Sequence, residues 1–69
     1  MPPKPKEVLK KLESFGFEVV RSSGSHIVLR HKDGRQTYVA MHTKDLPIGT
    51  YKSILKQANI SKEEFENTK

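Results

Sequence analysis

The triplet Gly24-Ser25-His26 holds the residue types best suited to chemistry in this sequence. Histidine exchanges a proton near neutral pH, which suits it to general acid or base catalysis. Gly24 lets the backbone turn tightly and approach a ligand, and Ser25 adds a hydroxyl group. Arg30 follows His26 by four residues, so both lie on the same face of a strand. Together these groups could handle a phosphodiester; the alternative is an ordinary surface histidine at a strand end.

The other two histidines are weaker candidates. His31 lies an odd number of residues from His26, so an unbroken strand places the two rings on opposite faces. It also adjoins Asp33-Gly34, which predicts a tight two-residue hairpin turn. That turn pairs His26 with Met41 and leaves His42 next to this pair, either as a second polar group or as a structural residue.

Composition excludes several kinds of site. Without cysteine there is no disulfide, no thiolate zinc site and no cysteine nucleophile. The sequence has no paired carboxylates, no glycine-rich phosphate loop and no zinc spacing of histidines. We therefore expect no metal and no cofactor. No apolar segment resembles a signal peptide or a membrane span, so a cytoplasmic protein without a membrane partner is expected.

Net charge points to a polyanionic partner. Thirteen Lys and Arg against eight Asp and Glu give +5 at pH 7, with a pI of about 9.7. A small basic domain of this kind suits nucleic acid, although the charge could also serve solubility alone. The cations that we expect to contact such a nucleic acid, with Gly24 and Ser25, are Arg30, Lys44, Lys52 and Lys56.

Hydrophobic spacing and turn residues predict the elements. Val8, Leu9, Leu12 and Phe15 repeat at helical spacing, as do Tyr51, Ile54, Leu55 and Ala58. Short β-branched runs separated by turn residues predict strands. The predicted elements are helix 3–14, strands 17–21, 26–30 and 37–41, a helix from Pro47 and a one-turn helix after Ser61.

This order predicts one α+β domain over residues 1–69. We expect a three-stranded antiparallel sheet with two helices on one face, the topology of double-stranded RNA-binding domains. The predicted pairing assigns Ile27, Leu29, Tyr38 and Ala40 to the helix-covered face. The open face then carries His26, Val28, Arg30, Thr37, Val39 and Met41.

The sequence resembles the HicA family over almost its whole length. Each matching piece is short, but their order and spacing are specific. The pieces are Lys6-Glu7-Val8-Leu9, Gly16-Phe17, Gly24-Ser25-His26, His31, Asp33-Gly34-Arg35, Val39, His42, Asp45-Leu46-Pro47-Ile48-Gly49-Thr50, Ser53-Ile54-Leu55-Lys56-Gln57-Ala58, Ile60-Ser61 and Glu63-Glu64-Phe65. Two departures are Ala40, where members often carry proline, and Ile27, where many carry a second histidine.

The resemblance implies a toxin of a type II toxin–antitoxin pair. Members are mRNA interferases, which are endoribonucleases, with a double-stranded-RNA-binding-like fold. The catalytic histidine of the family falls on His26, and the glycine of its motif falls on Gly24. The implied partners are an mRNA substrate and a HicB-type antitoxin, which we expect to dock on the sheet face bearing His26, Val28, Val39 and Met41.

One mechanism that these residues could support begins with attack by a ribose 2′-OH on the adjacent phosphorus. His26 would take the proton, and Arg30 with Lys44 would stabilise the phosphoryl oxygens. His42, a lysine or water could protonate the leaving group, and direct hydrolysis stays open. A non-catalytic RNA-binding module is the main alternative. A DNA-binding regulator is a third, although the helix from Pro47 offers few base-reading side chains.

Overall fold

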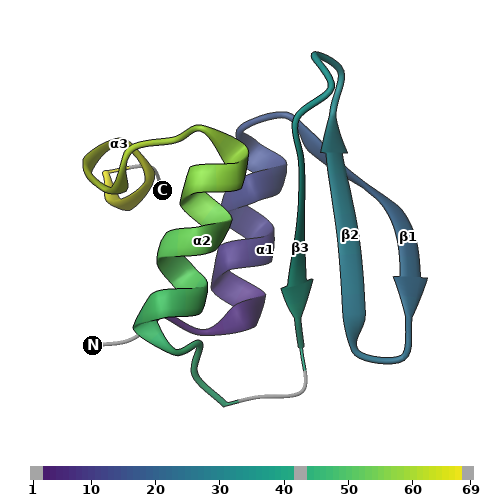
Figure 1. Ribbon diagram of the computed structural model, residues 1–69, viewed down its shortest axis with the longest axis horizontal. Coiled ribbons are helices and arrows are strands. Elements are labelled where there is room, and N and C mark those ends of the chain that lie inside the picture. Colours follow the sequence, from purple (N-terminus) through teal and green to yellow (C-terminus); the bar gives the residue numbers. More distant parts are fainter. Residues whose placement is uncertain (1–2, 42–43, 68–69) are drawn as a thin grey trace.

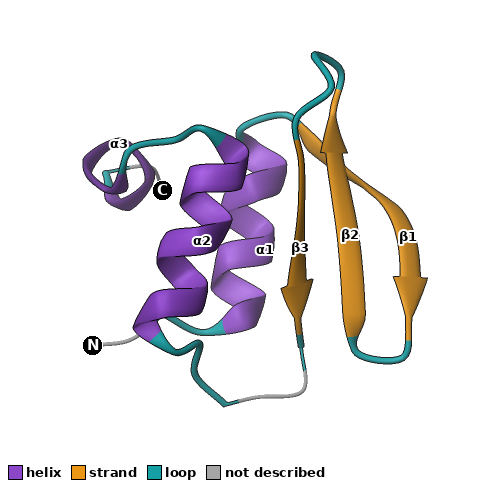
Figure 2. Cartoon of the chain, in the orientation of Figure 1, coloured by secondary structure: helices purple, strands orange, loops and turns teal. Residues whose placement is uncertain are grey.

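The predicted α-β-β-β-α order with a short final helix is confirmed. The computed structural model describes residues 3–41 and 44–67 (Figure 1). Three antiparallel strands form a sheet in the order β1-β2-β3, and the helices lie on one side of it (Figure 2). The elements are α1 (Pro5–Ser14), β1 (Phe17–Ser23), β2 (His26–His31), β3 (Gln36–Ala40), α2 (Ile48–Ala58) and α3 (Lys62–Glu66).

The first helix begins two residues later than predicted. Lys4 is extended, with φ −91° and ψ 144°, because a residue before proline is disfavoured in the helical region. Pro5 then occupies the first helical turn, where its missing N–H costs nothing. Glu7 accepts a hydrogen bond from the Lys4 backbone N–H at 3.4 Å, which satisfies one free donor at this end.

The end of α2 and the start of α3 are set by residues whose types favour these positions. Asn59 adopts the left-handed conformation after α2, with φ 57°, and Ile60 N–H donates back to the Leu55 carbonyl at 3.0 Å. This arrangement closes the helix and buries Ile60. Ser61 Oγ then accepts from Glu64 N–H at 3.1 Å and starts α3.

The turn between β2 and β3 corrects the predicted register. It holds three residues, 32–34, because His31 N–H donates to the Arg35 carbonyl at 2.8 Å. Gly34 takes a positive φ of 100°, as in the hairpin in which a type I turn is followed by a left-handed glycine. The predicted two-residue turn is therefore wrong, and His26 pairs with Ala40 rather than with Met41.

This shift of one residue exchanges the two faces of β3. Thr37 and Val39 are buried beneath the helices, whereas Tyr38 and Ala40 lie on the opposite face, contrary to the sequence-based assignment. We call the helix-covered side the inner face and the other side the outer face. The strand residues on the inner face of β2 and β3 are Ile27, Leu29, Thr37 and Val39.

The core lies between the inner face and the helices. α1 contacts β1 and β3, α2 packs on β3, and α3 packs on α2. Both predicted helical stripes contribute, and the buried apolar residues are Val8, Leu12, Phe17, Leu29, Val39, Leu46, Tyr51, Ile54, Leu55, Ala58, Ile60 and Phe65. Within the part of the chain that the structure describes, no helix is long and apolar enough to cross a bilayer.

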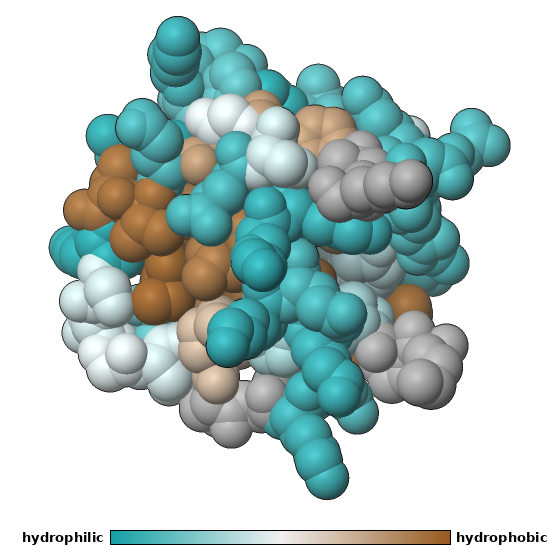
Figure 3. Space-filling model, turned by 180° about the vertical axis from the view of Figure 1, so that it is seen from behind, coloured by the Kyte–Doolittle hydropathy of each residue, from teal (hydrophilic) through white to brown (hydrophobic). Residues whose placement is uncertain are grey.

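The helices cover β1 less completely than the other strands. Val19 faces the helix side but is 44% exposed, and Val20 beside it is 49% exposed. Seen from behind, an apolar patch lies on the side of the molecule that carries β1 (Figure 3). The sheet edge at β1 is therefore apolar and open, whereas the edge at β3 is flanked by α2.

Candidate functional site

The outer face presents its side chains in three cross-strand rows. Paired residues of antiparallel strands point to the same side, so the register defines each row. The rows run from the β1–β2 turn toward the β2–β3 turn, and each takes one residue from each strand. They are Ser23, His26 and Ala40 in the first row; Arg21, Val28 and Tyr38 in the second; and Glu18, Arg30 and Gln36 in the third.

A β-bulge places Arg21 on this face. Simple alternation from buried Phe17 would turn Arg21 toward the helices. The register shifts between Val19 and Arg21, so Val20 is the additional residue and Arg21 pairs with Val28. Arg21 is thus a diagonal neighbour of His26, at a separation of about 7–8 Å for residues in this relation.

His26 lies at the exposed end of the outer face. The two-residue turn Gly24-Ser25 precedes it, with Gly24 in the left-handed conformation at φ 60°. Met41 N–H donates to the Ser25 carbonyl at 2.7 Å, which fixes this turn against the end of β3. Apart from its chain neighbours, no heavy atom of the described residues lies within 4 Å of where a Gly24 Cβ would be, so the backbone is open to approach on that side.

Tyr38 is the aromatic neighbour of His26. The ring centroids are 6.3 Å apart and the planes are inclined by 36°. Tyr38 is 52% exposed, although it sits in the middle of a strand. The second row therefore places an exposed aromatic ring between the row of His26 and the row of Arg30.

Arg30 lies at the far end of the outer face from the turn. Its Nε and Nη2 donate to Gln36 Oε1 at 3.0 and 2.9 Å, which holds the guanidinium in the third row. Four residues of strand separate Arg30 from His26 by about 13 Å along the backbone. The shared face was predicted correctly, but Arg21 is the nearer cation to His26.

His31 occupies a different environment at the other end of β2. Its ring packs edge-on against buried Phe17, with centroids 5.2 Å apart. Its Nδ1 accepts the Asp33 N–H at 3.2 Å and lies 3.1 Å from Asp33 Oδ1. A Cβ added at Gly16 would come within 2.8 Å of its Nε2. These contacts make His31 part of the packing between the strands and α1.

In the same turn, the carboxylate of Asp33 forms an ion pair with Arg35. Arg35 Nε donates to both oxygens of Asp33, at 2.9 and 3.1 Å, and its backbone N–H donates to Oδ1 at 3.1 Å. These bonds hold the pKa of Asp33 below its usual value. Arg35 also donates from Nη1 to the Ala58 carbonyl, which joins the hairpin to the C-terminal end of α2. Asp33 is thus structural.

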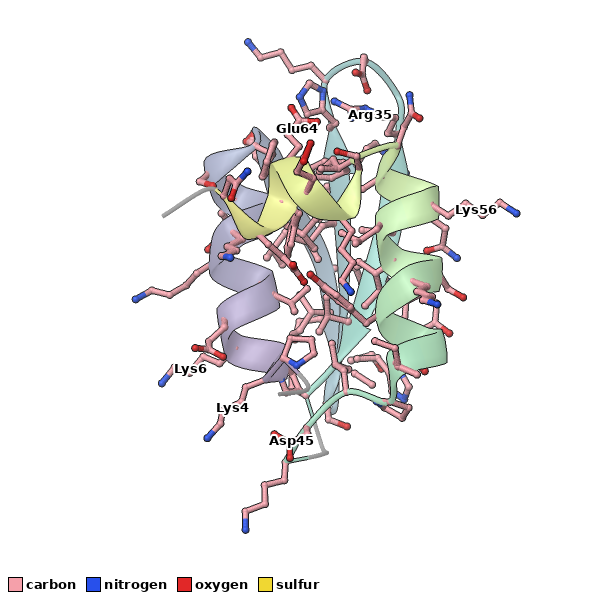
Figure 4. All side chains as sticks on the ribbon, turned by 90° about the vertical axis from the view of Figure 1, so that its left-hand side faces the viewer. Lys4, Lys6, Arg35, Asp45, Lys56 and Glu64 are labelled. Atoms are coloured by element: carbon pink, nitrogen blue, oxygen red, sulfur yellow. The ribbon has the colours of Figure 1, made fainter. Side chains whose placement is uncertain are left out.

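The predicted cations do not all share one surface. Lys52 and Lys56 are exposed residues of α2, in the layer on the inner side of the sheet, and Lys56 projects outward from this helix (Figure 4). Lys44 is exposed in the connection from β3 to α2. The structure therefore brings Gly24, Ser25 and Arg30 onto the sheet with His26, but not the α2 lysines. His42 lies outside the described residues.

Sequence reasoning missed Arg21 and Tyr38. The bulge that turns Arg21 outward leaves no clear mark in Phe17-Glu18-Val19-Val20-Arg21, although two adjacent exposed valines are compatible with one. Tyr38 was placed on the covered face by the assumed turn length. Gly34 could have indicated the correct turn length, because a glycine at this position suits a three-residue hairpin loop as well as a two-residue one.

A larger hollow lies in the other layer. We call it the helix groove; it is lined by α1, residues 45–47, α2 and α3, and its volume is about 700 Å³. Its charges are mixed, with acidic Glu7, Asp45 and Glu66 beside basic Lys11 and Lys62. The described residues that line the groove include no histidine, and their charges are not uniformly positive, as phosphodiester chemistry would require.

Tyr51 lines the base of the helix groove. Its hydroxyl donates to Glu66 Oε2 at 3.2 Å, and the residue is only 2% exposed. Burial, with the nearby Glu66 carboxylate, raises the pKa of Tyr51 to about 12. A tyrosine so stabilised in its neutral form is a packing residue rather than an acid or base near neutral pH.

The comparison with protein families decides the identity. The family model described as the HicA toxin of bacterial toxin–antitoxin systems matches residues 5–60, which include every strand of the sheet and both long helices. The chain belongs to the HicA toxin family. No curated protein matches it. HicA toxins are the toxin components of toxin–antitoxin pairs and are generally endoribonucleases.

In residues 3–41 and 44–67, no group of three or more His, Cys, Asp or Glu side chains could hold a metal ion. The acidic residues nearest the outer face and the β2–β3 turn are Glu18, opposite Arg30, and Asp33, which is bound to Arg35. The outer face carries the His26 imidazole, the Tyr38 phenol and the guanidinium groups of Arg21 and Arg30.

Proposed function

We propose that this HicA toxin cleaves mRNA with His26 as its catalytic residue and without a metal ion. The observation that carries the proposal is the position of His26. Among the described residues it is the exposed histidine, and it shares the outer face with Arg21 and Tyr38. His31, by contrast, is packed against Phe17 and bound to the Asp33 turn.

The reaction begins at the ribose next to the scissile phosphate. His26 removes the proton of the 2′-OH while the 2′ oxygen attacks the adjacent phosphorus, and the bond from phosphorus to the 5′ oxygen breaks. The leaving 5′ oxygen takes a proton from the protonated imidazole or from water. The products are a 2′,3′-cyclic phosphate and a 5′-hydroxyl end. General base catalysis of this kind contributes about 10²–10⁴ in rate.

Two cations serve two successive positions on the RNA. Arg21 lies one row from His26, within reach of the phosphoryl oxygens on which charge develops. Arg30 lies two rows away and is held by Gln36, so it binds a neighbouring phosphate rather than the reacting one. The open backbone at Gly24 lets the RNA strand approach the turn without a clash.

The antitoxin partner acts by covering the same outer face. The exposed apolar anchors there are Tyr38 and, at the bulge, Val20, since Val39 is fully buried and Met41 packs against the core. A HicB-type partner with acidic side chains for Arg21 and Arg30 and an apolar contact for Tyr38 would block RNA access to His26. Burial of this patch in the complex stabilises the folded toxin by mass action.

Modified RNA tests the reaction directly. Purified protein is incubated with EDTA and an end-labelled RNA that carries one 2′-deoxynucleotide at a mapped cleavage position. We expect cleavage of the unmodified RNA in EDTA, cyclic phosphate ends, and no cleavage at the deoxy position alone. Cleavage at the deoxy position would contradict attack by the 2′-OH, and loss of all activity in EDTA would contradict a metal-independent reaction. RNA binding without any cleavage would favour the binding-module alternative.

A further inference from the structure

We propose that Tyr38 forms a nucleobase-binding site that selects single-stranded RNA. In this arrangement an unpaired base next to the scissile phosphodiester stacks on the Tyr38 ring while His26 faces the ribose. The inference rests on the proposed function, because it places the base one row from the catalytic histidine. It adds a substrate class and a residue that selects it.

Exposure sets Tyr38 apart from the other aromatic residues. Phe17, Tyr51 and Phe65 are at most 2% exposed, Phe15 is partly buried against the core, and Tyr38 is 52% exposed. Tyr51 also bonds through its hydroxyl to Glu66 and thereby fixes α3. Tyr38 contributes little to such packing, so a role in binding accounts better for a large aromatic ring at this position.

Tyr38 keeps about half of its surface exposed although it contacts His26. The 6.3 Å centroid distance is near the long end of the range for aromatic pairs, and the planes are inclined by 36°. Ala40, which is opposite His26 in the first row, is a small residue. The small side chain of Ala40 therefore takes up little of the surface beside the imidazole.

Charge on the outer face matches a nucleic acid strand. Arg21 is in the same row as Tyr38, and Arg30 is in the next row, held by Gln36. Glu18 is the single acidic member of the three rows. A backbone running along these cations places its phosphates near the guanidinium groups and its bases over Tyr38. Positive charge beside an exposed aromatic ring is the usual combination in single-strand-binding surfaces.

Stacking on Tyr38 requires an unpaired base. In an RNA duplex the faces of the bases are covered by their neighbours, and proteins recognise the duplex by its shape and backbone. A ring that lies on a sheet can reach a base face only when the base is unstacked. The outer face therefore suits single-stranded segments of mRNA, although the fold itself is shared with domains that bind duplexes.

A binding experiment with RNA that cannot be cleaved tests the site. The probe is a short single-stranded RNA with 2′-O-methyl groups, compared with the same RNA in a duplex, and affinity is measured by fluorescence anisotropy. Stacking is worth about 1–3 kcal/mol per base, so Tyr38→Ala should weaken binding about 5- to 150-fold. Tyr38→Phe keeps the ring and should bind within about twofold of the natural protein. Ile48→Ala, a control in α2 where Ile48 is 55% exposed, should not change affinity.

An abasic scan locates the stacked base. Each nucleotide of the probe is replaced in turn by an abasic one. One position should weaken binding to the natural protein but not to Tyr38→Ala, because the variant has already lost that contact. Equal affinity of Tyr38→Ala and the natural protein, or preference for the duplex, would overturn the inference.

The failure of this inference can be told apart from failure of the proposed function. Tyr38→Ala that binds and cleaves RNA normally, with His26→Ala inactive, refutes the base site alone. Full cleavage by a folded His26→Ala protein refutes the catalytic proposal instead. Thermal melting of each variant confirms that exposed Tyr38 is replaced without unfolding.

Discussion

The outer face of the sheet and the helix groove differ in both shape and chemistry. The helix groove is the larger hollow, at about 700 Å³, and its lining mixes acidic and basic side chains. The outer face has a smaller hollow of about 320 Å³, lined by Val20, Arg21, Val28, Arg30 and Gln36. It also carries His26 and Tyr38 in adjacent rows. Size alone would select the groove, whereas the distribution of titratable and cationic groups selects the sheet.

The two regions also differ in how much their side chains contribute to the stability of the fold. The groove residues Tyr51 and Phe65 are buried and contact each other, with ring centroids 6.0 Å apart, so they stabilise the fold. His26 and Arg21 are exposed and contribute little to packing. The exposed basic side chains on the strands are therefore positions where a substitution can change the ligand without loss of stability.

The largest expected effect is a difference in RNA cleavage rate between a His26 variant and a Tyr51 variant. His26→Ala should reduce single-turnover RNA cleavage by about 10²–10⁴-fold, because a general base is lost. Tyr51→Phe removes only the hydroxyl that bonds to Glu66 and should leave the cleavage rate per folded molecule unchanged. Rates are compared after thermal melts confirm that both variants are folded. A Tyr51→Phe protein that is folded but inactive would move the catalytic site to the groove.

Phe65 tests the groove as a stability element. The ring is 1% exposed and stacks on Phe15 with centroids 5.8 Å apart. Phe65→Ala should cost about 3–5 kcal/mol, which is comparable to the whole stability of such a small domain. The milder Phe65→Leu should cost less than about 1.5 kcal/mol in urea unfolding and keep its cleavage rate. Unchanged stability in Phe65→Ala would show that α3 is not part of the core.

Salt dependence compares the cations of the two layers. Arg21→Gln should weaken RNA binding and reduce the slope of log affinity against log salt by about 0.7, the loss of one phosphate contact with a single strand. Lys56→Gln, in α2, should leave the slope unchanged if RNA is bound by the sheet alone. The opposite pattern would support the sequence-based expectation that Lys52 and Lys56 bind RNA.

The smallest effect is the titration of Tyr51. Its pKa is raised to about 12 in the folded protein, so the fold favours its neutral form. The stability that this provides is complete below the unfolded pKa of about 10 and is lost as pH rises through the folded value. The ultraviolet absorbance of tyrosinate should show a late step near pH 12 that Tyr51→Phe removes. A step that persists in that variant would assign the late titration elsewhere.

The helices were predictable because their signals are local. Tyr51, Ile54, Leu55 and Ala58 repeat at helical spacing, and all four are buried. The Ser61 cap likewise forms the bond to Glu64 N–H that its spacing predicts. Such patterns depend on a few neighbouring residues, so tertiary contacts did not alter them.

The sheet was less predictable because its faces depend on single residues. One additional residue in the turn at Asp33-Gly34 reversed the assignment of Tyr38 and Val39. One additional residue at Val20 brought Arg21 to the outer face. Both follow from the two-residue period of a strand, in which any insertion reverses all later side chains. The position of His26 on the outer face was predicted correctly because it alternates with the apolar residues Ile27 and Leu29, which face the helices.

The central claim is that RNA binds on the outer face beside His26. The most direct test is the nuclear magnetic resonance footprint of a 2′-O-methyl single-stranded RNA on isotope-labelled protein. We expect the largest shift changes at Arg21, His26 and Tyr38, with little change around the helix groove. Changes centred on Lys52 and Lys56 of α2, with His26 unaffected, would contradict this account.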